Sequence, residues 1–414
     1  MTLTAPQSIQ QATPLNLLLA ARVESRRGEI TAILREISDH RAVHYEIDAA
    51  LATLRGAEAE VDRHRPATVD SVTVFLPSNV LLYSWVLYVA VPLNFAHRID
   101  LRAASAVKSQ TQRLHALLSE GLDLPVVLHD VPQREFVEEV ASRTSVVVFT
   151  GAYQNAENIR HQLAPDQLML FLGSGINPFV VGPKSDLCHA VEELVSIRCL
   201  NSGQDCLAPD VVWVHEDVRD AFLHRLRMCL RDVIDSDPED PTLHRYGALQ
   251  YADALGATTA FLVKHRDRIK HGGALALDKG VVAPTVLLWE TTPRKVPTAE
   301  FFAPVFNLAT YRSEDALTDM MLSGRYAESA MGVSLFGCSS RTADRLSALY
   351  TVTVDASLLA VDDGNAPLGG RGPMANYIAH QGKLVARPIL ISQAVAETLG
   401  RRAGQDPTAS EVLG

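Results

Sequence analysis

One cysteine stands where covalent chemistry is possible. Cys206 lies in the segment Asn201-Ser-Gly-Gln-Asp-Cys-Leu-Ala, after a glycine-containing turn and behind a segment predicted to be helical over 187–200. A cysteine at such a turn can be exposed with a lowered thiol pKa, and the thiolate is the nucleophilic form. A thiolate that attacks a carbonyl creates an oxyanion, which needs hydrogen-bond donors nearby. From these residues alone, a catalytic Cys206 and a buried structural cysteine both remain open.

The remaining cysteines point to packing rather than to chemistry. They lie in predicted helices or apolar runs, where a free cysteine behaves as a small apolar residue; these are Cys188, Cys199, Cys229 and Cys338. The chain has 5 cysteines and no C-x-x-C pair, which argues against a disulfide framework and a zinc cage. We therefore expect no metal site and a reducing, cytoplasmic location.

Length and composition exclude several classes of protein. The 414 residues suggest two to three domains, and a hydrophobic content of 47% excludes a mainly disordered chain. The net charge of −10 makes nucleic acid or an anionic membrane an improbable partner. The uncharged stretch 72–96 is interrupted by Pro77, Asn79 and Pro92, so it predicts a buried strand, turn and helix rather than a membrane span. The N-terminus has no positive region typical of a signal peptide.

The elements that position these residues follow from the apolar pattern. Residues 1–65 read as helical, with Ile30, Ile33, Leu34 and Ile37 on one face. From residue 70, short apolar runs alternate with helical segments, which predicts βαβ units and parallel sheets. A second block of the same kind begins near Gly173, and a last strand is predicted over 384–391. The expected strands include 72–76, 99–102, 124–128, 145–149, 179–181, 211–214, 285–288 and 305–311.

The Cys206 segment resembles the cysteine signature N-x-G-Q-x-C-x-A of the aldehyde dehydrogenase superfamily. Further segments are similar to motifs of this family, and they occur in the same order along roughly residues 70–392. They are Pro77-Ser-Asn-Val-Leu-Leu, Phe149-Thr-Gly-Ala, Leu170-Phe-Leu-Gly-Ser-Gly-Ile-Asn-Pro, Val282-Ala-Pro-Thr-Val-Leu, Glu300-Phe-Phe-Ala-Pro-Val and Pro367-Leu-Gly-Gly-Arg-Gly.

The resemblance implies an α/β fold with two Rossmann-type domains and a small β extension for oligomerisation. Residues 1–172, with part of 374–414, would bind NAD or NADP, and 173–373 would form the catalytic domain. Residues 383–392 and a strand near 66–76 would form the extension, which implies a homodimer or homotetramer. Cys206 would be the nucleophile and Asn79 the side-chain oxyanion donor. The residues implied to hold the cofactor are Arg102, Ser105, Thr150, Gly151, Ala152, Glu300 and Phe302.

Two departures from the family pattern change the expected chemistry. Where hydrolytic members carry a glutamate that activates water, this chain has Phe171, which cannot take a proton. Where members carry a lysine and a glutamate at the adenosine ribose, this chain has Arg102 and Ser105. A cation without the repelling carboxylate favours NADP or the use of both cofactors. Alternatively, this short strand is misaligned with the family motif and Arg102 is a surface residue.

The expected function is therefore an NAD(P)-dependent oxidoreductase that interconverts an aldehyde and an activated acyl group through a Cys206 thioester. The acyl group would pass to CoA, a carrier thiol or phosphate, as the resemblance to acylating and acyl-reductase branches implies. Two alternatives stay open. One is an ordinary aldehyde dehydrogenase that forms a free acid, and the other is a non-catalytic member that serves as a binding or scaffold subunit.

Overall fold

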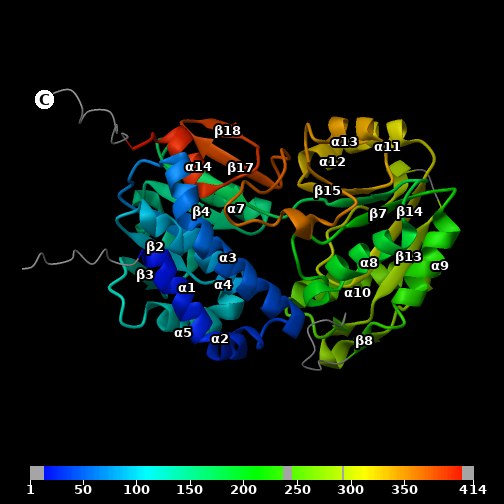
Figure 1. The fold of residues 1–414 in the computed structure, drawn as a ribbon, viewed down its shortest axis with the longest axis horizontal. Coiled ribbons are helices and arrows are strands. Elements are labelled where there is room, and N and C mark those ends of the chain that lie inside the picture. The colour runs from blue at the N-terminus through cyan, green and yellow to red at the C-terminus, as the bar shows by residue number, and fades with distance from the viewer. Residues whose placement is uncertain (1–13, 236–244, 291–292, 403–414) are drawn as a thin grey trace, which may run out of the picture.

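The computed structural model describes residues 14–235, 245–290 and 293–402. In Figure 1 the chain forms two lobes, each built around a sheet, with residues 14–172 and the C-terminal end in the same lobe. This is the α/β architecture that the alternating pattern and the family resemblance predicted. No helix among the described residues is long and apolar enough to cross a bilayer.

The first sheet combines strands from the N-terminal and the C-terminal parts of the chain. Strands β1 to β5 run parallel, and the late strands β17 and β18 add antiparallel to the β5 edge. Within the described residues the order of its strands is β18 (Lys383–Val385), β17 (Asn376–His380), β5 (Leu168–Leu172), β4 (Val146–Thr150), β1 (Val72–Phe75), β2 (Ile99–Arg102) and β3 (Val126–His129).

Helices cover both faces of this sheet. One face packs on α1 (Leu15–Ser25), α2 (Arg27–Leu34), α3 (His40–His64), α4 (Leu81–Trp85), α5 (Lys108–Ser119) and α14 (Ile391–Thr398), and the other on α6 (Gln133–Glu139) and α7 (Tyr153–Arg160). The predicted apolar face of the N-terminal helices is buried in this core, with Ile30 and Leu34 fully covered.

The second sheet is formed by the middle of the chain. Its strands run parallel except β10, which is antiparallel at one edge. In the described segments the order is β10 (Ile269–His271), β13 (Thr285–Trp289), β14 (Val305–Tyr311), β7 (Val211–His215), β6 (Pro178–Val181), β15 (Gly332–Phe336) and β16 (Thr351–Val354). Two small pairs accompany it: β8 (Ile234–Asp235) with β9 (Arg245–Tyr246), and β11 (Leu275–Ala276) with β12 (Val281–Val282).

Helices flank this sheet as well. Helices α8 (Leu187–Arg198) and α9 (Arg219–Cys229) pack on one face, and α11 (Glu314–Met321), α12 (Gly324–Glu328) and α13 (Ser340–Leu346) pack on the other. Helix α10 (Ala252–Lys264) precedes β10.

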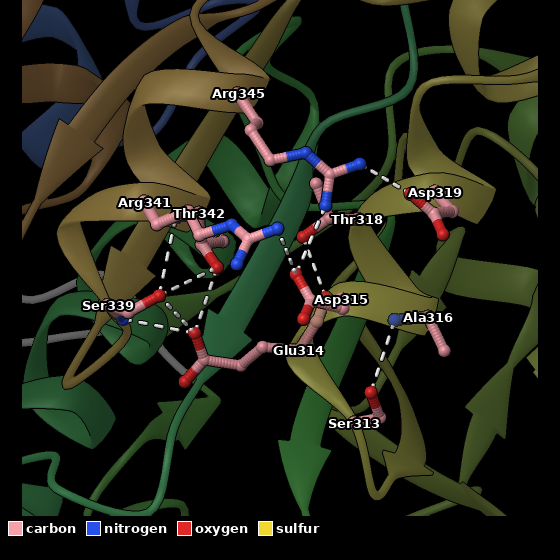
Figure 2. Close-up of polar contacts among 10 residues, drawn as sticks. All are labelled: Ser313, Glu314, Asp315, Ala316, Thr318, Asp319, Ser339, Arg341, Thr342 and Arg345. Atoms are coloured by element: carbon pink, nitrogen blue, oxygen red, sulfur yellow. Dashed lines mark hydrogen bonds and ion pairs between the residues drawn. The ribbon is translucent and has the colours of Figure 1, made fainter.

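Polar side chains join α11 to α13, as Figure 2 shows. Glu314, in the first turn of α11, accepts hydrogen bonds from the hydroxyls of Ser339 and Thr342 at 2.8 Å each. Arg345 forms ion pairs with Asp315 and Asp319. A carboxylate at the N-terminus of α13 also complements its helix dipole. This contact fixes the helices on the face of the sheet remote from α8.

The structure corrects two expectations about the C-terminal region. The strand predicted over 384–391 is wrong: β18 ends at Val385 and α14 begins at Ile391. Pro388 has no amide donor for a ladder, which explains why the strand does not continue. The proposed extension of 383–392 with a strand near 66–76 is also wrong as a unit. Strand β1 lies in the middle of the first sheet between β4 and β2, whereas β18 pairs only with β17 among the described strands.

Candidate functional site

The C-terminal edge of the first sheet gathers several of the predicted site residues. Asn79 follows β1, Arg102 ends β2, Thr150 ends β4 and Phe171 lies near the end of β5. These strands are parallel, so their carboxyl ends meet at one edge, where open α/β sheets bind ligands.

Arg102 and Ser105 lie side by side after β2. The Arg102 guanidinium donates to the Val131 carbonyl at 3.0 Å and approaches the Ser105 hydroxyl at 3.5 Å. Ser105 is exposed, and burial lowers the pKa of Arg102 without bringing an acidic partner to it. A cation held beside an exposed hydroxyl suits a phosphate-bearing ligand.

The segment after β4 fits the phosphate part of a dinucleotide. The Thr150 hydroxyl is buried and makes no hydrogen bond of normal geometry within the described residues, although the Tyr88 hydroxyl lies near it. Helix α7 begins at Tyr153, and no side chain caps its N-terminus. Free backbone amides at a helix N-terminus bind phosphate well. The Thr150 hydroxyl and the uncapped first turn of α7 therefore leave donors for the expected NAD(P), whereas the Gly151 amide donates to the Leu172 carbonyl at 3.2 Å.

Asn79 lies in a strained turn that a buried carboxylate supports. Val80 has φ of 45°, which a β-branched residue rarely adopts. Glu46 of α3 accepts hydrogen bonds from the amides of Leu82 (2.6 Å) and Tyr83 (3.3 Å) and so caps α4. Burial raises the pKa of Glu46 to about 7. The Asn79 side-chain amide then reaches the Gln204 carbonyl at 3.4 Å, two residues before Cys206.

The loop before Cys206 has an unusual backbone that other segments hold in place. Asn201, Ser202 and Gly203 all have positive φ, at 48°, 55° and 77°. A side chain at Gly203 would meet the Ala303 carbonyl at 2.5 Å, so glycine is required there. Three backbone amides from other segments brace the loop by donating to its side chains: Asp39 to Asn201 Oδ1 (3.3 Å), Gly247 to Ser202 Oγ (2.8 Å) and Gln250 to Gln204 Oε1 (2.6 Å).

Cys206 is half-buried, and its surroundings oppose ionisation. Burial raises the pKa of the thiol well above its ordinary value, and Asp205, Asp362 and Glu300 raise it further. The expectation of a lowered pKa is therefore wrong for the protein without ligands. Because the thiol stays protonated near neutral pH, attack on a carbonyl needs a group that takes its proton.

Two of these carboxyl groups were not singled out as bases by the sequence analysis. Asp362, in the chain between β16 and β17, accepts hydrogen bonds from the hydroxyls of Tyr45 (2.7 Å) and Tyr83 (3.1 Å). Burial raises the pKa of Asp362, and it raises the pKa of Asp205 to about 6. Asp205 has no recognisable base motif, and only the fold brings Asp362 near Cys206.

Glu300 and Phe302 lie on a loop that contacts the Cys206 loop. The carboxyl group of Glu300 accepts a hydrogen bond from Ser174, and burial of that group raises its pKa, although the residue as a whole is exposed. The Phe302 ring lies 5.7 Å from the Tyr251 ring, centre to centre. Since Gly203 packs against Ala303, the two loops cannot move apart without losing this contact.

Phe171 is fully buried in a cluster of aromatic side chains. Its ring lies 5.0 Å from Tyr377, 6.1 Å from Tyr153 and 6.4 Å from Phe149, measured between ring centres. The tip of the ring also covers Gly173, where an added Cβ would lie 2.4 Å from it. This position therefore holds packing contacts and no proton acceptor.

Asn177 and Asp210 connect Cys206 to the second sheet. The Asn177 side chain donates to the Cys206 carbonyl at 2.7 Å and accepts from the Gly332 amide at 3.1 Å. Asp210 accepts from the Asn177 amide at 2.9 Å. Asn177 lies within the segment 170–178, which resembles a family motif. Asp210 could have been noticed in the sequence because it is an acidic residue directly before the apolar strand that begins at Val211.

The other cysteines and the histidines within the described residues occupy varied surroundings. Cys199 is buried, whereas Cys188 is exposed, with its sulfur 2.9 Å from the Arg225 guanidinium, so the prediction of a packed Cys188 is wrong. His40 and His44 lie one helical turn apart with ring nitrogens at 3.1 Å. In the described part of the chain, no group of three or more histidine, cysteine, aspartate or glutamate side chains could hold a metal ion.

Known proteins share both the sequence pattern and the fold. Residues 23–370 match the family model "Aldehyde dehydrogenase family". Among curated proteins, the chain is 23% identical over 376 residues to 4,4'-diapolycopene-4,4'-dial dehydrogenase of Cytobacillus firmus, covering 87% of this chain and 79% of the relative. It is 24% identical to coniferyl aldehyde dehydrogenase of a Pseudomonas species, over 70% of this chain and 62% of that protein.

Solved structures give the same fold at low identity. Succinic semialdehyde dehydrogenase from Streptococcus pyogenes, in complex with NADP+, superposes with a TM-score of 0.78 at 15% identity, covering 91% of this chain and 89% of that one. Glyceraldehyde-3-phosphate dehydrogenase from Methanocaldococcus jannaschii, complexed with NADP, gives 0.77 at 18% identity, covering 93% and 86%. The family match spans most of the chain and includes the Cys206 loop, so this protein belongs to the aldehyde dehydrogenase family of NAD(P)-dependent oxidoreductases.

Proposed function

We propose that the enzyme interconverts an aldehyde and an activated acyl group, with Cys206 as the nucleophile. The Cys206 sulfur adds to the aldehyde carbon, and its proton passes to a nearby carboxyl group. The side-chain amide of Asn79 and the backbone amide of Cys206 stabilise the resulting oxyanion. NAD(P), when bound, supplies the acceptor for the hydride that leaves the thiohemiacetal carbon. A thioester on Cys206 results.

The fate of this thioester depends on which acceptor attacks it, and the observation that favours an acceptor other than water is Phe171. Water needs a base to take its proton, and a positioned base typically contributes 10²–10⁴-fold. The position that holds this base in hydrolytic members is a ring buried among Phe149, Tyr153 and Tyr377. An external thiolate instead attacks the thioester carbon and expels the Cys206 thiolate, with one carbon–sulfur bond formed and one broken.

The charges near Cys206 favour one class of acceptor. The charges with the largest effect on the Cys206 thiol are those of Asp205, Asp362 and Glu300, and all three are acidic. A phosphate ion would meet like charges there, whereas the thiol arm of CoA or of a carrier protein is neutral along its length. We therefore place a thiol ahead of phosphate as the acceptor.

A second candidate is an ordinary dehydrogenase that releases a free acid. Asp362 and Asp205 favour it, because carboxyl groups with raised pKa values near the thioester could activate water in place of the absent glutamate. The curated relatives are also named as dehydrogenases of aldehydes.

Single-turnover kinetics decide between the two. Enzyme is mixed with aldehyde and NADP+, and acylated protein is followed by mass spectrometry in plain buffer, with CoA and with phosphate. We expect persistent acyl-enzyme in buffer and rapid loss with CoA. Rapid loss in buffer, with free acid as product and no effect of CoA, would establish the second candidate. A non-catalytic role would show as no acylation under any condition.

The remaining assignments are proposals as well. Arg102 beside Ser105 supports a preference for NADP over NAD, with Thr150, Gly151, Ala152, Glu300 and Phe302 as further cofactor contacts. Residues 1–172, with part of 374–414, would bind the cofactor, and 173–373 would carry the nucleophile. A homodimer or homotetramer is proposed, which sedimentation can test. The free thiols suit the reducing conditions of a cytoplasm.

A further inference from the structure

A buried arginine lies behind the Cys206 loop, and its side chain bonds to backbone carbonyls. Arg198 is the last residue of α8, and its side chain is 0% exposed. Its Nη1 has no hydrogen-bond partner within the described residues. A buried guanidinium costs several kcal/mol to desolvate, so its retention needs a compensating contact.

The contacts of Arg198 are backbone carbonyls of one loop. Its Nε donates to Val305 O at 3.0 Å, and its Nη2 donates to Ala303 O at 2.7 Å and to Phe301 O. These carbonyls follow Glu300 directly, and Phe302 lies between them. The planar fork of the guanidinium therefore fixes the path of the loop that presents Glu300 and Phe302.

Asp210 completes the link to the nucleophile. It is 2% exposed, and it accepts from the Phe301 amide at 3.4 Å and from the Asn177 amide at 2.9 Å. Asn177 in turn donates to the Cys206 carbonyl at 2.7 Å. Arg198 thus binds carbonyl groups of the 300–305 loop, and Asp210 binds an amide of the same loop. Asp210 is also linked to Cys206, through Asn177.

We propose that Arg198 and Asp210 are positioning residues that set the distance between the cofactor-holding loop at Glu300–Phe302 and the Cys206 loop. They act through the backbone and do not touch the cofactor themselves. This inference rests on the proposed cofactor role of Glu300 and Phe302, and it is independent of whether the acyl acceptor is a thiol or water.

The sequence carried a signal for Arg198. Val191, Leu194, Val195 and Arg198 follow the spacing i, i+3, i+4, i+7, which places the arginine on the apolar face of its helix. A charge on such a face is unusual unless it has a specific task.

The test compares R198K with wild type and with R345M. Lysine keeps the charge but loses the planar fork, whereas Arg345 lies on α13 and forms ion pairs with Asp315 and Asp319 of α11 (Figure 2). Binding of NADPH is measured by fluorescence titration and thermal unfolding by calorimetry. We expect R198K to raise the Kd for NADPH about tenfold or more in the folded protein, with R345M unchanged.

The outcomes separate positioning from mere stabilisation. A folded R198K with a lower unfolding temperature and an unchanged Kd overturns the proposal. If R198K does not fold, D210N carries the test, because Asp210 accepts the Asn177 amide on Oδ2 and the Phe301 amide on Oδ1, and asparagine offers only one acceptor oxygen. It is expected to raise the Kd likewise, and an unchanged Kd overturns the proposal. Failure of the acyl-transfer experiment alone leaves these Kd values unaffected.

Discussion

The Cys206 loop and the end of β5 correspond to two segments that the family resemblance places at one catalytic centre, yet their side chains differ in kind: one is polar and the other is aromatic. The Cys206 loop is braced by polar side chains, through Asn201, Ser202 and Gln204, and keeps its strained backbone. The end of β5 is filled by Phe171 and neighbouring rings. In the function that we propose, this combination keeps the geometry that forms an acyl-enzyme and lacks the group that would hydrolyse it.

The largest test of this contrast removes the nucleophile. Cys206→Ala should abolish aldehyde oxidation, with a loss on the order of 10⁴-fold or more, because no covalent intermediate can form. Steady-state NADPH formation measures it. Cys188→Ser is the matched control, since Cys188 is exposed and lies on α8. Substantial activity in Cys206→Ala would refute the covalent route.

Removing the predicted oxyanion donor should come next. Asn79→Ala should lower kcat by roughly 10²–10³-fold, since one side-chain donor to the oxyanion is lost. Stopped-flow measurement of the first turnover detects it, with Asn158→Ala on α7 as a control for loss of an amide. If both variants behave alike, the contact of Asn79 with Gln204 is only structural.

A smaller effect is expected at the cofactor edge. Ser105→Glu should weaken NADPH binding about tenfold more than NADH binding, because a carboxylate beside Arg102 repels the 2′-phosphate and competes for the cation. Ser105→Gln adds similar bulk without charge and should leave the ratio unchanged. Equal weakening of both cofactors would show that this strand does not contact the 2′ position.

The smallest effect concerns the carboxylate beneath the Asn79 turn. Glu46 has a pKa raised to about 7 by burial, so its folded form holds a proton more tightly than its unfolded form. The protonated Glu46 carboxyl group therefore contributes to the free energy of unfolding. This contribution is fully present below the ordinary carboxyl pKa and is lost as pH rises through about 7. Glu46→Gln should remove this loss, so that the free energy of unfolding at pH 8 is higher than that of wild type by on the order of 1–3 kcal/mol.

Urea unfolding at pH 5 and pH 8 measures this difference. Glu58→Gln, an exposed change on the same helix α3, should show the pH dependence of wild type. A Glu46→Gln protein that loses as much stability with rising pH as wild type would contradict the assignment.

The sequence predicted the elements whose apolar runs are bounded by turn residues, such as β2, β7 and β14. It did not identify β5, β15, β16, β17 or α10 as elements. β15, over Gly332–Phe336, is short and buried along its whole length, so it lacks the solvent-exposed polar face that marks a half-buried strand. The prediction of a last strand over 384–391 was wrong because Pro388 interrupts an apolar run that is otherwise typical of a strand.

The site was predictable where residues belong to contiguous motifs and not where the fold alone brings them together. Asn79, Cys206, Glu300 and Phe302 stand in such motifs. Asp362 and Tyr83 lie near Cys206 only because α4 and the segment after β16 approach one another, which no local sequence pattern predicts. The sign of the Cys206 pKa shift was missed for the same reason, since it depends on burial and on distant carboxyl groups.

The pairing of β5 with β17 has a consequence for how the chain is made. Tyr377 lies opposite Phe171 but follows it by 377 − 171 = 206 residues, and the whole second sheet is encoded between them. At about 5–20 residues per second, a ribosome leaves the β5 edge unpaired for roughly 10–40 s. An open strand edge is a site of misassembly during that interval. The second sheet can fold as a unit while the first waits for its closing strand, so nascent chains halted before residue 376 should depend most on chaperones.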